Sequence, residues 1–430
     1  MNKIINGVIV GFGNRGEVYA DYSLQVEGEF KVVAVVDPNP FKLEIAKEKY
    51  HLTSDQVFTS LDEFVAKKVE ADIVINATMD ELHYETAMKI LAAGYDMLIE
   101  KPIVPNEAQL KDIEALAKKN GNKVFVCHVL RYTPFYRTIK ELINNGEIGT
   151  IMTMEMNEHV CLQHYSSAYL RGKWNNEAKC GSGLILAKSC HDLDIMCWLN
   201  NASAPKSVSS FGGRKLFTKE NKPKDATKYC FECPHKDTCP LSSVTLYENH
   251  NTMPFLVFDR MNKKLDDITL DEKKEFLHKD IYGMCGYDIE SDLVDRQTTI
   301  VEFENGSEAA FTLLGCATRP DRYIHIIGSH GEIEGKIGDN KITLRTYTND
   351  VWNYKNEEID LSNKVVNLAR FGGHNGGDFL IMHDLCAYLN NDKSSISITS
   401  LSDSINGHLC VYAAEKSRKQ HVIVDFKEEE

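Results

Sequence analysis

A glycine-rich segment near the N-terminus has the residue types and spacing of a dinucleotide-binding turn. It reads Gly11, Phe12, Gly13, Asn14, Arg15 and Gly16, the pattern GxGxxG, and Asp37 ends the next apolar run 21 residues after Gly16. Glycines permit a tight turn and a close approach to a pyrophosphate, and a helix N-terminus supplies amide donors. Asp37 would accept hydrogen bonds from the ribose hydroxyls and repel a 2′-phosphate. The segment therefore predicts a site for NAD rather than NADP.

Two further apolar runs end in polar residues that belong at the same edge of a parallel sheet. Thr78 and His83 follow one run, and Glu100 and Lys101 follow the next. Because ligands of doubly wound sheets bind at the carboxyl ends of the strands, we expect these four residues to line the nicotinamide half of the site. For His83, a helix-capping or core role is the alternative.

A second group of candidates could carry out proton transfer. Lys188 and His191 stand three residues apart in a helical pattern, so both can point at one substrate. An imidazole of pKa near ~6.5 suits acceptance of a hydroxyl proton as a hydride leaves. Lys101 and Lys188 could stabilise the alkoxide, or one of them could act as a neutral base. The alternatives are a buried structural His191 and a salt bridge of Lys188 with Asp192 or Glu155.

Further polar and aromatic residues suit a substrate that is bound by hydrogen bonds and stacking, as sugars are. Each of them could equally decorate a loop, and Asp378 beyond His374 could simply cap a helix. The substrate-facing candidates are Arg131, Tyr132, His164, Arg171, Trp174 and His374.

Three cysteines form a cluster in a charge-rich part of the chain. Cys230, Cys233 and Cys239 have the spacing CxxC-x5-C, and Cys285 is a remote fourth thiol. CxxC knuckles present two thiolates to one tetrahedral ion, which predicts a structural zinc site. His235 is a second candidate for the fourth ligand. Reduced thiols or a single disulfide are the alternatives.

The elements that must position these residues follow two rhythms. Strand and helix patterns alternate up to residue 129, which predicts a parallel, doubly wound Rossmann domain over 1–129. Alternating strands with few helices then predict an α/β domain with an open, mainly antiparallel sheet over 130–430. Two closing helices are expected over 372–389 and 402–417. The weakly periodic residues 215–280 are interpreted as an insertion that contains the cysteine cluster.

Composition narrows the class of protein. The chain has 430 residues and a formal net charge of −14, which disfavours nucleic acid or an anionic membrane as its main partner. No stretch approaches the ~18 apolar residues of a membrane span, and the first ten residues lack the pattern of a signal peptide. Twelve scattered cysteines suit a reducing compartment. We therefore expect a cytoplasmic protein.

The chain resembles the glucose-fructose oxidoreductase/inositol dehydrogenase family. The resemblance is carried by the N-terminal GFGNRG, the segment 77–83, the tripeptide Glu100-Lys101-Pro102, and GSGL at 181–184 leading to HDLD at 191–194. It implies a Rossmann domain followed by an open-sheet domain, with Lys101 contacting substrate and cofactor and His191 as acid/base. It also implies a small carbohydrate or polyol substrate and pairing of chains into a homo-oligomer.

One departure from the family pattern leaves the reaction open. Many family dehydrogenases carry an Asp four residues before the histidine, where this chain has Ala187, and Lys188 instead gives a Lys-x-x-His signature. The first hypothesis is an NAD-dependent oxidoreductase of a sugar, inositol or glycoside hydroxyl. The second is a redox-neutral glycoside hydrolase or lyase that acts through a transient keto-sugar. The third is an NAD-binding sensor without turnover.

Overall fold

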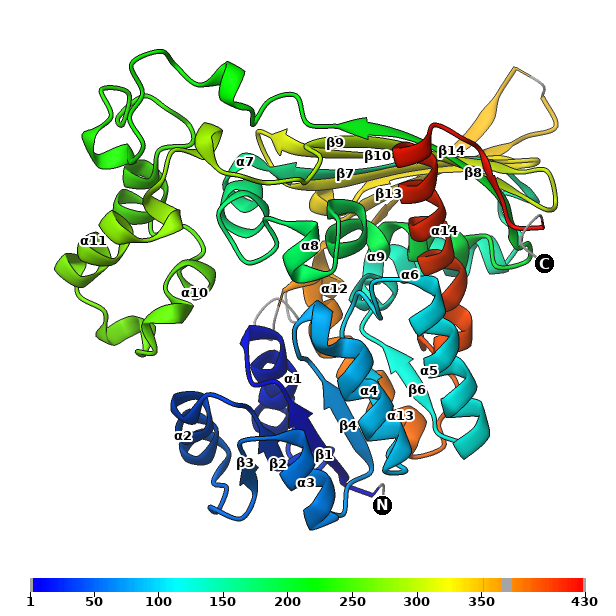
Figure 1. Cartoon of the computed structure of the whole chain (residues 1–430). Coiled ribbons are helices and arrows are strands. Elements are labelled where there is room, and N and C mark those ends of the chain that lie inside the picture. Colours follow the sequence, from blue (N-terminus) through cyan, green and yellow to red (C-terminus); the bar gives the residue numbers. More distant parts are fainter. Residues whose placement is uncertain (1–2, 351, 366–372, 428–430) are drawn as a thin grey trace.

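The first sheet is a parallel Rossmann sheet. The computed structural model describes residues 3–350, 352–365 and 373–427, and within them this sheet has the strand order β3-β2-β1-β4-β5-β6, parallel throughout (Figure 1). Its strands are buried on both faces, as in β4, because helices cover each side. The strands are β1 (Ile5–Val10), β2 (Phe30–Val36), β3 (Val57–Phe58), β4 (Ile73–Asn76), β5 (Met97–Ile99) and β6 (Val124–Val126). The helices are α1 (Asn14–Gln25), α2 (Pro40–Tyr50), α3 (Leu61–Lys67), α4 (His83–Ala92) and α5 (Glu107–Asn120).

The second sheet is mixed and mainly antiparallel, as predicted. Among the described residues its order is β14-β13-β12-β11-β7-β10-β9-β8-β15, and only the β7–β10 pair is parallel. Its strands are β7 (Ile151–Cys161), β8 (Pro205–Gly213), β9 (Arg296–Phe303), β10 (Glu308–Ala317), β11 (Asp321–Gly328), β12 (Gly331–Lys336), β13 (Lys341–Tyr347), β14 (Tyr354–Asp360) and β15 (Val424–Asp425).

Helices cover the face of this sheet that is turned toward the first domain (Figure 1). They are α6 (Pro134–Asn144), α7 (Leu162–His164), α8 (Glu177–Cys180), α9 (Leu184–Leu199) and α14 (Leu401–Gln420). Two further helices are α12 (Ser362–Val365) and α13 (Gly377–Leu389), and α13 packs against α1 of the first domain. Helix α9 lies at the centre, and every one of its residues except Lys188 is buried. Lys188 is thus the one residue of α9 that is less buried. Its position marks a polar site between the two sheets.

The insertion is longer and more ordered than the sequence pattern predicted. It runs from the end of β8 to the start of β9, and it contains α10 (Pro254–Val257) and α11 (Leu270–Lys279). A capping box between Thr269 and Glu272 starts α11. The insertion has a small core of its own, which weak periodicity did not reveal because short turns contribute most of it. The buried residues of this core are Leu246, Tyr247, Val257, Phe258, Ile268, Leu277 and Tyr282.

The C-terminal half of the chain contributes to the core of the first domain. The helix expected over 372–389 begins at Gly377, and Gly372 lies outside the described residues. Ile381, Met382 and Leu385 of α13 are buried in one cluster with Phe12 and Tyr19. A division of the sequence near residue 129 therefore does not divide the two hydrophobic cores.

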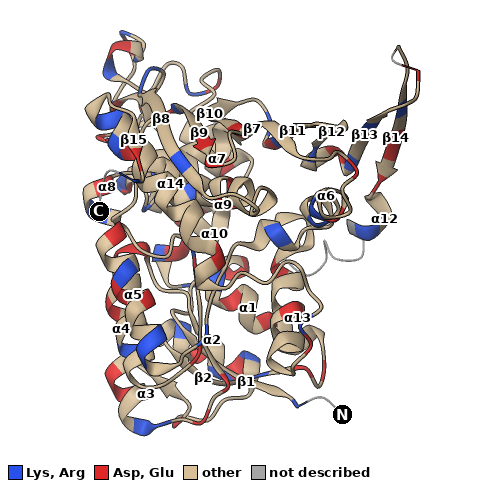
Figure 2. Cartoon of the chain, turned by 90° about the vertical axis from the view of Figure 1, so that its right-hand side faces the viewer, with Lys and Arg blue, Asp and Glu red and all other residues tan. Residues whose placement is uncertain are grey.

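Charge is spread over the outer surface in small groups of both signs. Figure 2 shows Lys or Arg next to Asp or Glu along the outer helices of both domains. Among the described helices, none is both long and apolar enough to cross a bilayer.

A buried ion pair ties the end of the first sheet to α9. The guanidinium of Arg131 donates to both carboxylate oxygens of Asp194, at 2.7 and 2.6 Å, and both residues are 1% exposed. A bidentate pair of this kind fixes the angle between its two elements.

We expect Asp194→Ala to lower the free energy of unfolding by ~3–5 kcal/mol, because it leaves the Arg131 cation buried without its counter-charge. Urea unfolding followed by circular dichroism measures this. Glu275→Ala, which breaks the exposed Lys279–Glu275 pair on α11, is the control and should leave unfolding unchanged. Equal unfolding of the Asp194 variant and the wild type would refute a structural role for the pair.

Candidate active site between the two domains

The glycine turn has the space and backbone geometry that a pyrophosphate requires. Gly11 has φ +87°, and a Cβ there would lie 2.6 Å from the carbonyl oxygen of Ala77. A Cβ on Gly13 would meet no atom within 4 Å, so the backbone is open on that side. Gly13 also precedes α1 without a side-chain cap. The first-turn amides of α1 are thus presented toward open space, where an anionic group would bind.

Asp37 is placed beside this turn by the strand β2 that it follows. Its Oδ2 accepts from the backbone N–H of Phe12 at 2.7 Å and its Oδ1 from that of Asn39 at 2.8 Å. Burial raises the pKa of Asp37, and these two backbone donors oppose the shift. The carboxylate is therefore held in a fixed orientation at the end of β2, as a ribose-binding group must be.

The glycine turn is linked to the end of β5 through Glu100. This carboxylate accepts from Arg15 Nε at 2.6 Å, from the hydroxyl of Tyr19 at 2.5 Å and from the backbone N–H of Lys101 at 2.8 Å. Burial raises the pKa of Glu100, but the neighbouring Arg15 and Lys101 lower it more, so it stays ionised. Arg15 and Glu100, predicted as cofactor ligands, are thus paired with each other, and Arg15 also binds Asp378 at 2.7 Å.

The three predicted catalytic residues lie in one region. The ammonium of Lys101 donates to the carbonyl of Ala187 on α9 at 2.9 Å. His191, one turn further along α9, is 3% exposed, and its Nδ1 has no hydrogen-bond partner among the described residues. Its pKa is lowered well below the usual range, first by burial and next by Lys101. A neutral imidazole with an unpaired nitrogen beside a lysine is an arrangement that can accept a proton.

Lys188 is paired with a buried acid that the sequence analysis did not select. Its ammonium lies 3.2 Å from Oε1 of Glu158 on β7, and Oε2 of Glu158 lies 2.6 Å from Arg322 Nε. Arg322 also binds Asp192 at 2.7 Å. Burial lowers the pKa of Lys188, and Glu158 acts in the opposite direction. The salt bridge considered for Lys188 thus exists, but with Glu158 rather than with Asp192 or Glu155.

A signal for Glu158 was present in the sequence. Met154, Met156, Glu158 and Val160 occupy every second position of β7, and all four are buried. An acid within an alternating apolar face needs a buried cation as partner.

Two of the predicted substrate residues, His374 and His164, lie beside His191 and Lys188. The ring of His374 is 6.0 Å from that of His191, and His374 Nδ1 lies 3.1 Å from Asp378. His164 precedes a π-helical turn over Tyr165–Leu170. The pKa of His164 is lowered well below its usual range, first by burial and then by Lys188 and His374.

Trp174 bridges the two domains. Its indole Nε1 donates to Asp80 Oδ2, beyond the end of β4, at 3.1 Å. Thr78, in the same loop, donates to Asn76 at 2.9 Å. The contact of Trp174 with Asp80 places the second domain against the loop that follows β4.

Four residues that were predicted to bind cofactor or substrate instead make internal structural contacts. Arg131 is held by Asp194, and Tyr132, 1% exposed, pairs with Thr399 at 3.1 Å. Arg171 is fully buried and donates to the carbonyls of Met284 and Leu241. His83 is also fully buried, between the carbonyls of Pro102 and Thr78 at 2.7 and 3.1 Å. Their polar groups already have internal partners and are withdrawn from solvent, so substrate and cofactor are not their partners here.

The cysteine cluster is only partly as predicted. Cys230, Cys233, Cys239 and Cys285 line one cavity of about 20 Å³, together with His235, and all four are free thiols. Within the described part of the chain, however, no group of three or more His, Cys, Asp or Glu side chains is arranged to hold a metal ion. The thiols converge, but a coordination shell is not formed.

Comparison with known proteins agrees with this geometry. Residues 5–128 match the model of an oxidoreductase family with an NAD-binding Rossmann fold, and residues 140–426 match the C-terminal α/β domain of the same family. The Bacillus subtilis protein YteT, described as an oxidoreductase, is 25% identical over 365 residues, which cover 83% of this chain and 82% of YteT.

Two further relatives are more distant or shorter matches. An inositol 2-dehydrogenase/D-chiro-inositol 3-dehydrogenase of Lactiplantibacillus plantarum is 28% identical over 196 residues, or 45% of this chain and 51% of that one. The WlbA dehydrogenase of Bordetella pertussis, solved with NADH and UDP-GlcNAcA, has the same fold, with a TM-score of 0.66, 16% identity and coverage of 99% and 98%. The chain belongs to the GFO/IDH/MocA family and is an NAD-dependent oxidoreductase.

Proposed function

We propose that this oxidoreductase removes a hydride from a hydroxyl-bearing carbon of a sugar, inositol or glycoside. The observation that carries the proposal is His191, whose imidazole is buried and neutral, has an Nδ1 that is unpaired among the described residues, and lies beside Lys101. A relative named for inositol oxidation and a structural neighbour solved with a nucleotide sugar support this substrate class. NAD, when bound, supplies the hydride acceptor.

The residues of the chain have separable roles in this proposal. His191 accepts the hydroxyl proton, and Lys101 stabilises the developing alkoxide. Lys188, held by Glu158, contributes a second donor toward the substrate. His164 and His374, which lie beside these groups, and Trp174, which is held by Asp80, contact the sugar. Gly11–Gly16, Asp37 and Thr78 hold the cofactor.

The redox-neutral reaction remains a second candidate because of Lys188. A lysine whose pKa is lowered by burial can take a proton from the carbon next to a transient ketone. That step precedes elimination of a leaving group in a hydrolase or lyase. Net formation of NADH with one substrate of a sugar, inositol and glycoside panel supports the dehydrogenase, whereas glycoside cleavage without it supports this alternative. Binding of NAD without any turnover would instead indicate a sensor.

We expect His191→Ala to lower kcat by about 10²–10⁴-fold and Lys101→Ala by about 10²–10³-fold, because each removes a group that acts on the reacting oxygen. Initial rates of NADH formation measure this. His330→Ala, an exposed histidine after β11, is the matched control and should retain wild-type rates. Full activity of the His191 variant would rule out its role as the base.

The depressed pKa of His191 also sets the pH dependence. A lowered pKa means that the imidazole is still neutral at pH 6.5 and gains a proton only in more acidic solution. We expect the acid limb of kcat/KM to lie well below pH 6.5. An acid limb at or above pH 6.5 would assign proton transfer to another group.

We also propose that the four converging thiols bind a structural zinc ion. Their CxxC-x5-C spacing and shared cavity support this, and a bound ion would draw the side chains into a tetrahedral shell. Burial raises the pKa of Cys239 and Cys285, so without a metal these two thiols stay protonated.

Protein purified from zinc-supplemented cells should contain about one zinc per chain by mass spectrometry. Cys230→Ser and Cys233→Ser should lose it, whereas Cys161→Ser, outside the insertion, should keep it. Metal-free wild-type protein in which all twelve cysteines titrate as thiols would refute the site.

The exposed face of the second sheet supports pairing of chains. Met152, Phe211 and Ile300 lie on β7, β8 and β9 and are 55%, 69% and 49% exposed. The strands β8 and β9 are adjacent, and β10 separates β9 from β7. Large apolar side chains exposed on one sheet are typical of an interface. We propose that the chain forms a homo-oligomer through this face. Light scattering of the native protein measures its oligomeric state.

A further inference from the structure

Part of the insertion returns to the first domain. Residues 254–267, here called the arm, comprise α10 and two short 3₁₀ turns over Asp259–Met261 and Leu265–Asp267. In Figure 1 the arm lies directly above α2 of the Rossmann domain. In sequence the arm is more than 200 residues away from α2 and belongs to the other domain.

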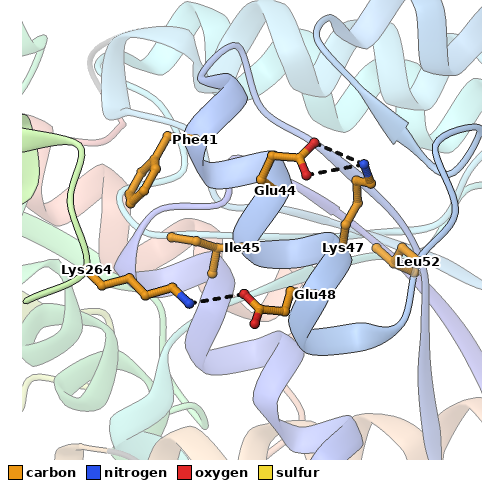
Figure 3. A pocket seen from close by; sticks show the side chains of 7 residues that line it. All are labelled: Phe41, Glu44, Ile45, Lys47, Glu48, Leu52 and Lys264. Carbon is orange, nitrogen blue, oxygen red and sulfur yellow. Dashed lines mark hydrogen bonds and ion pairs between the residues drawn. The ribbon is translucent and has the colours of Figure 1, made fainter. Parts of the chain in front are cut away.

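Three polar contacts join the arm to α2 and to the residue before it. Asn39 Nδ2 donates to Asn262 Oδ1 at 2.7 Å, and Lys42 Nζ lies 2.6 Å from Asp259 Oδ1. Lys264 Nζ lies 3.1 Å from Glu48 Oε2 (Figure 3). Each pair joins a donor to an acceptor. The polar groups of the arm therefore have complementary partners from the residue before α2 to its last turn.

The first of these contacts reaches the proposed ribose site. The backbone N–H of Asn39 donates to Asp37, and the side chain of the same Asn39 binds the arm through Asn262. Asp37 in turn accepts from the backbone of Phe12 in the glycine turn. One residue therefore separates the arm from the carboxylate that binds the adenosine ribose.

A cavity of about 540 Å³ lies between the arm and the Rossmann helices. Asn14 of the glycine motif and Lys42 line it from the first domain, and Phe255, Asp259 and Lys263 line it from the arm. Its volume is in the range of small-molecule sites. The cavity thus joins the glycine turn to the inner side of the arm.

Lys173 of the second domain lies between the arm and the loop that follows β4. Burial lowers its pKa, and Asp259 of the arm and Asp80 after β4 are the carboxylates that most oppose this shift. Its neighbour Trp174 donates to Asp80. The second domain therefore spans the distance from the loop after β4 to the arm, over the edge of the sheet where the strands end.

We propose that the arm completes the dinucleotide site by closing over its adenosine half, so that NAD(H) leaves only when the arm separates from α2. The proposal rests on the assignment of NAD to this site. Slow release would limit a dehydrogenase that exchanges its cofactor in every turnover, and it would not limit a redox-neutral reaction. The release rate compared with kcat therefore also bears on the choice between the two reactions.

The test is displacement of bound NADH by excess NAD⁺, followed by NADH fluorescence in the full-length protein. We expect the double variant Asp259→Ala/Asn262→Ala to release NADH about five- to tenfold faster than the wild type, since each exposed contact contributes only modestly. Glu275→Ala changes α11 of the same insertion but touches neither α2 nor the cavity, and it should release NADH at the wild-type rate.

A charge exchange separates closure from general loosening of the fold. Lys42→Asp and Asp259→Lys should each accelerate release, and the two together should restore slow release by re-forming the pair in reverse. Release at the wild-type rate from the double-alanine variant would overturn the role of the arm while leaving the cofactor assignment intact. A wild-type protein that binds no NADH would overturn the assignment itself and this proposal with it.

Discussion

The buried carboxylate of Glu100 is the constraint on which the site depends. A charge that is almost withdrawn from water must be paired, and this one has three partners in two parts of the chain: Arg15 and Tyr19 of α1, and the backbone of Lys101 after β5. Arg15 extends the network to Asp378 of α13. The glycine turn, the lysine-bearing end of β5 and the helix next to His374 are thereby fixed with respect to one another.

The catalytic region is built around a second balanced set of charges. Two cations, Lys188 and Arg322, alternate with two anions, Glu158 and Asp192, so burial of the group creates no net charge. Lys101 enters this region as an additional cation beside His191. The excess positive charge suits an oxygen that becomes negative as its proton and hydride leave.

Much of this arrangement could be predicted from the sequence, because some patterns determine their own surroundings. The spacing of Gly11, Gly13 and Gly16 relative to Asp37 requires a strand, a turn and a helix, and the structure contains them. Lys188 and His191 lie three residues apart in α9, and this spacing places them on one face of the helix. The family was predicted correctly from the glycine motif, Glu100-Lys101-Pro102 and the HDLD segment, and the two kinds of sheet from the alternation of strand and helix patterns.

What could not be predicted depends on partners that are distant in sequence. Arg131 has the residue type of a substrate ligand, but Asp194, 63 residues further on, occupies it. Arg171 is occupied by the carbonyls of residues 241 and 284 in the same way. A residue type indicates which chemistry is possible, and only the fold decides whether the group is still available. The alternation of β7 would have identified Glu158, because a buried acid must find a cation.

Helix α13 has a consequence for how the molecule is made. Its residues Ile381, Met382, Leu385 and Cys386 fill part of the core around α1, although the ribosome synthesises them some 250 residues after β6 is complete. The emerging Rossmann segment must therefore wait with an apolar face uncovered until nearly the whole chain has been translated. For the same reason, a chimera that exchanges cofactor domains between relatives must carry residues 377–389 along with the N-terminal segment, because a cut at residue 129 would leave that face without its cover.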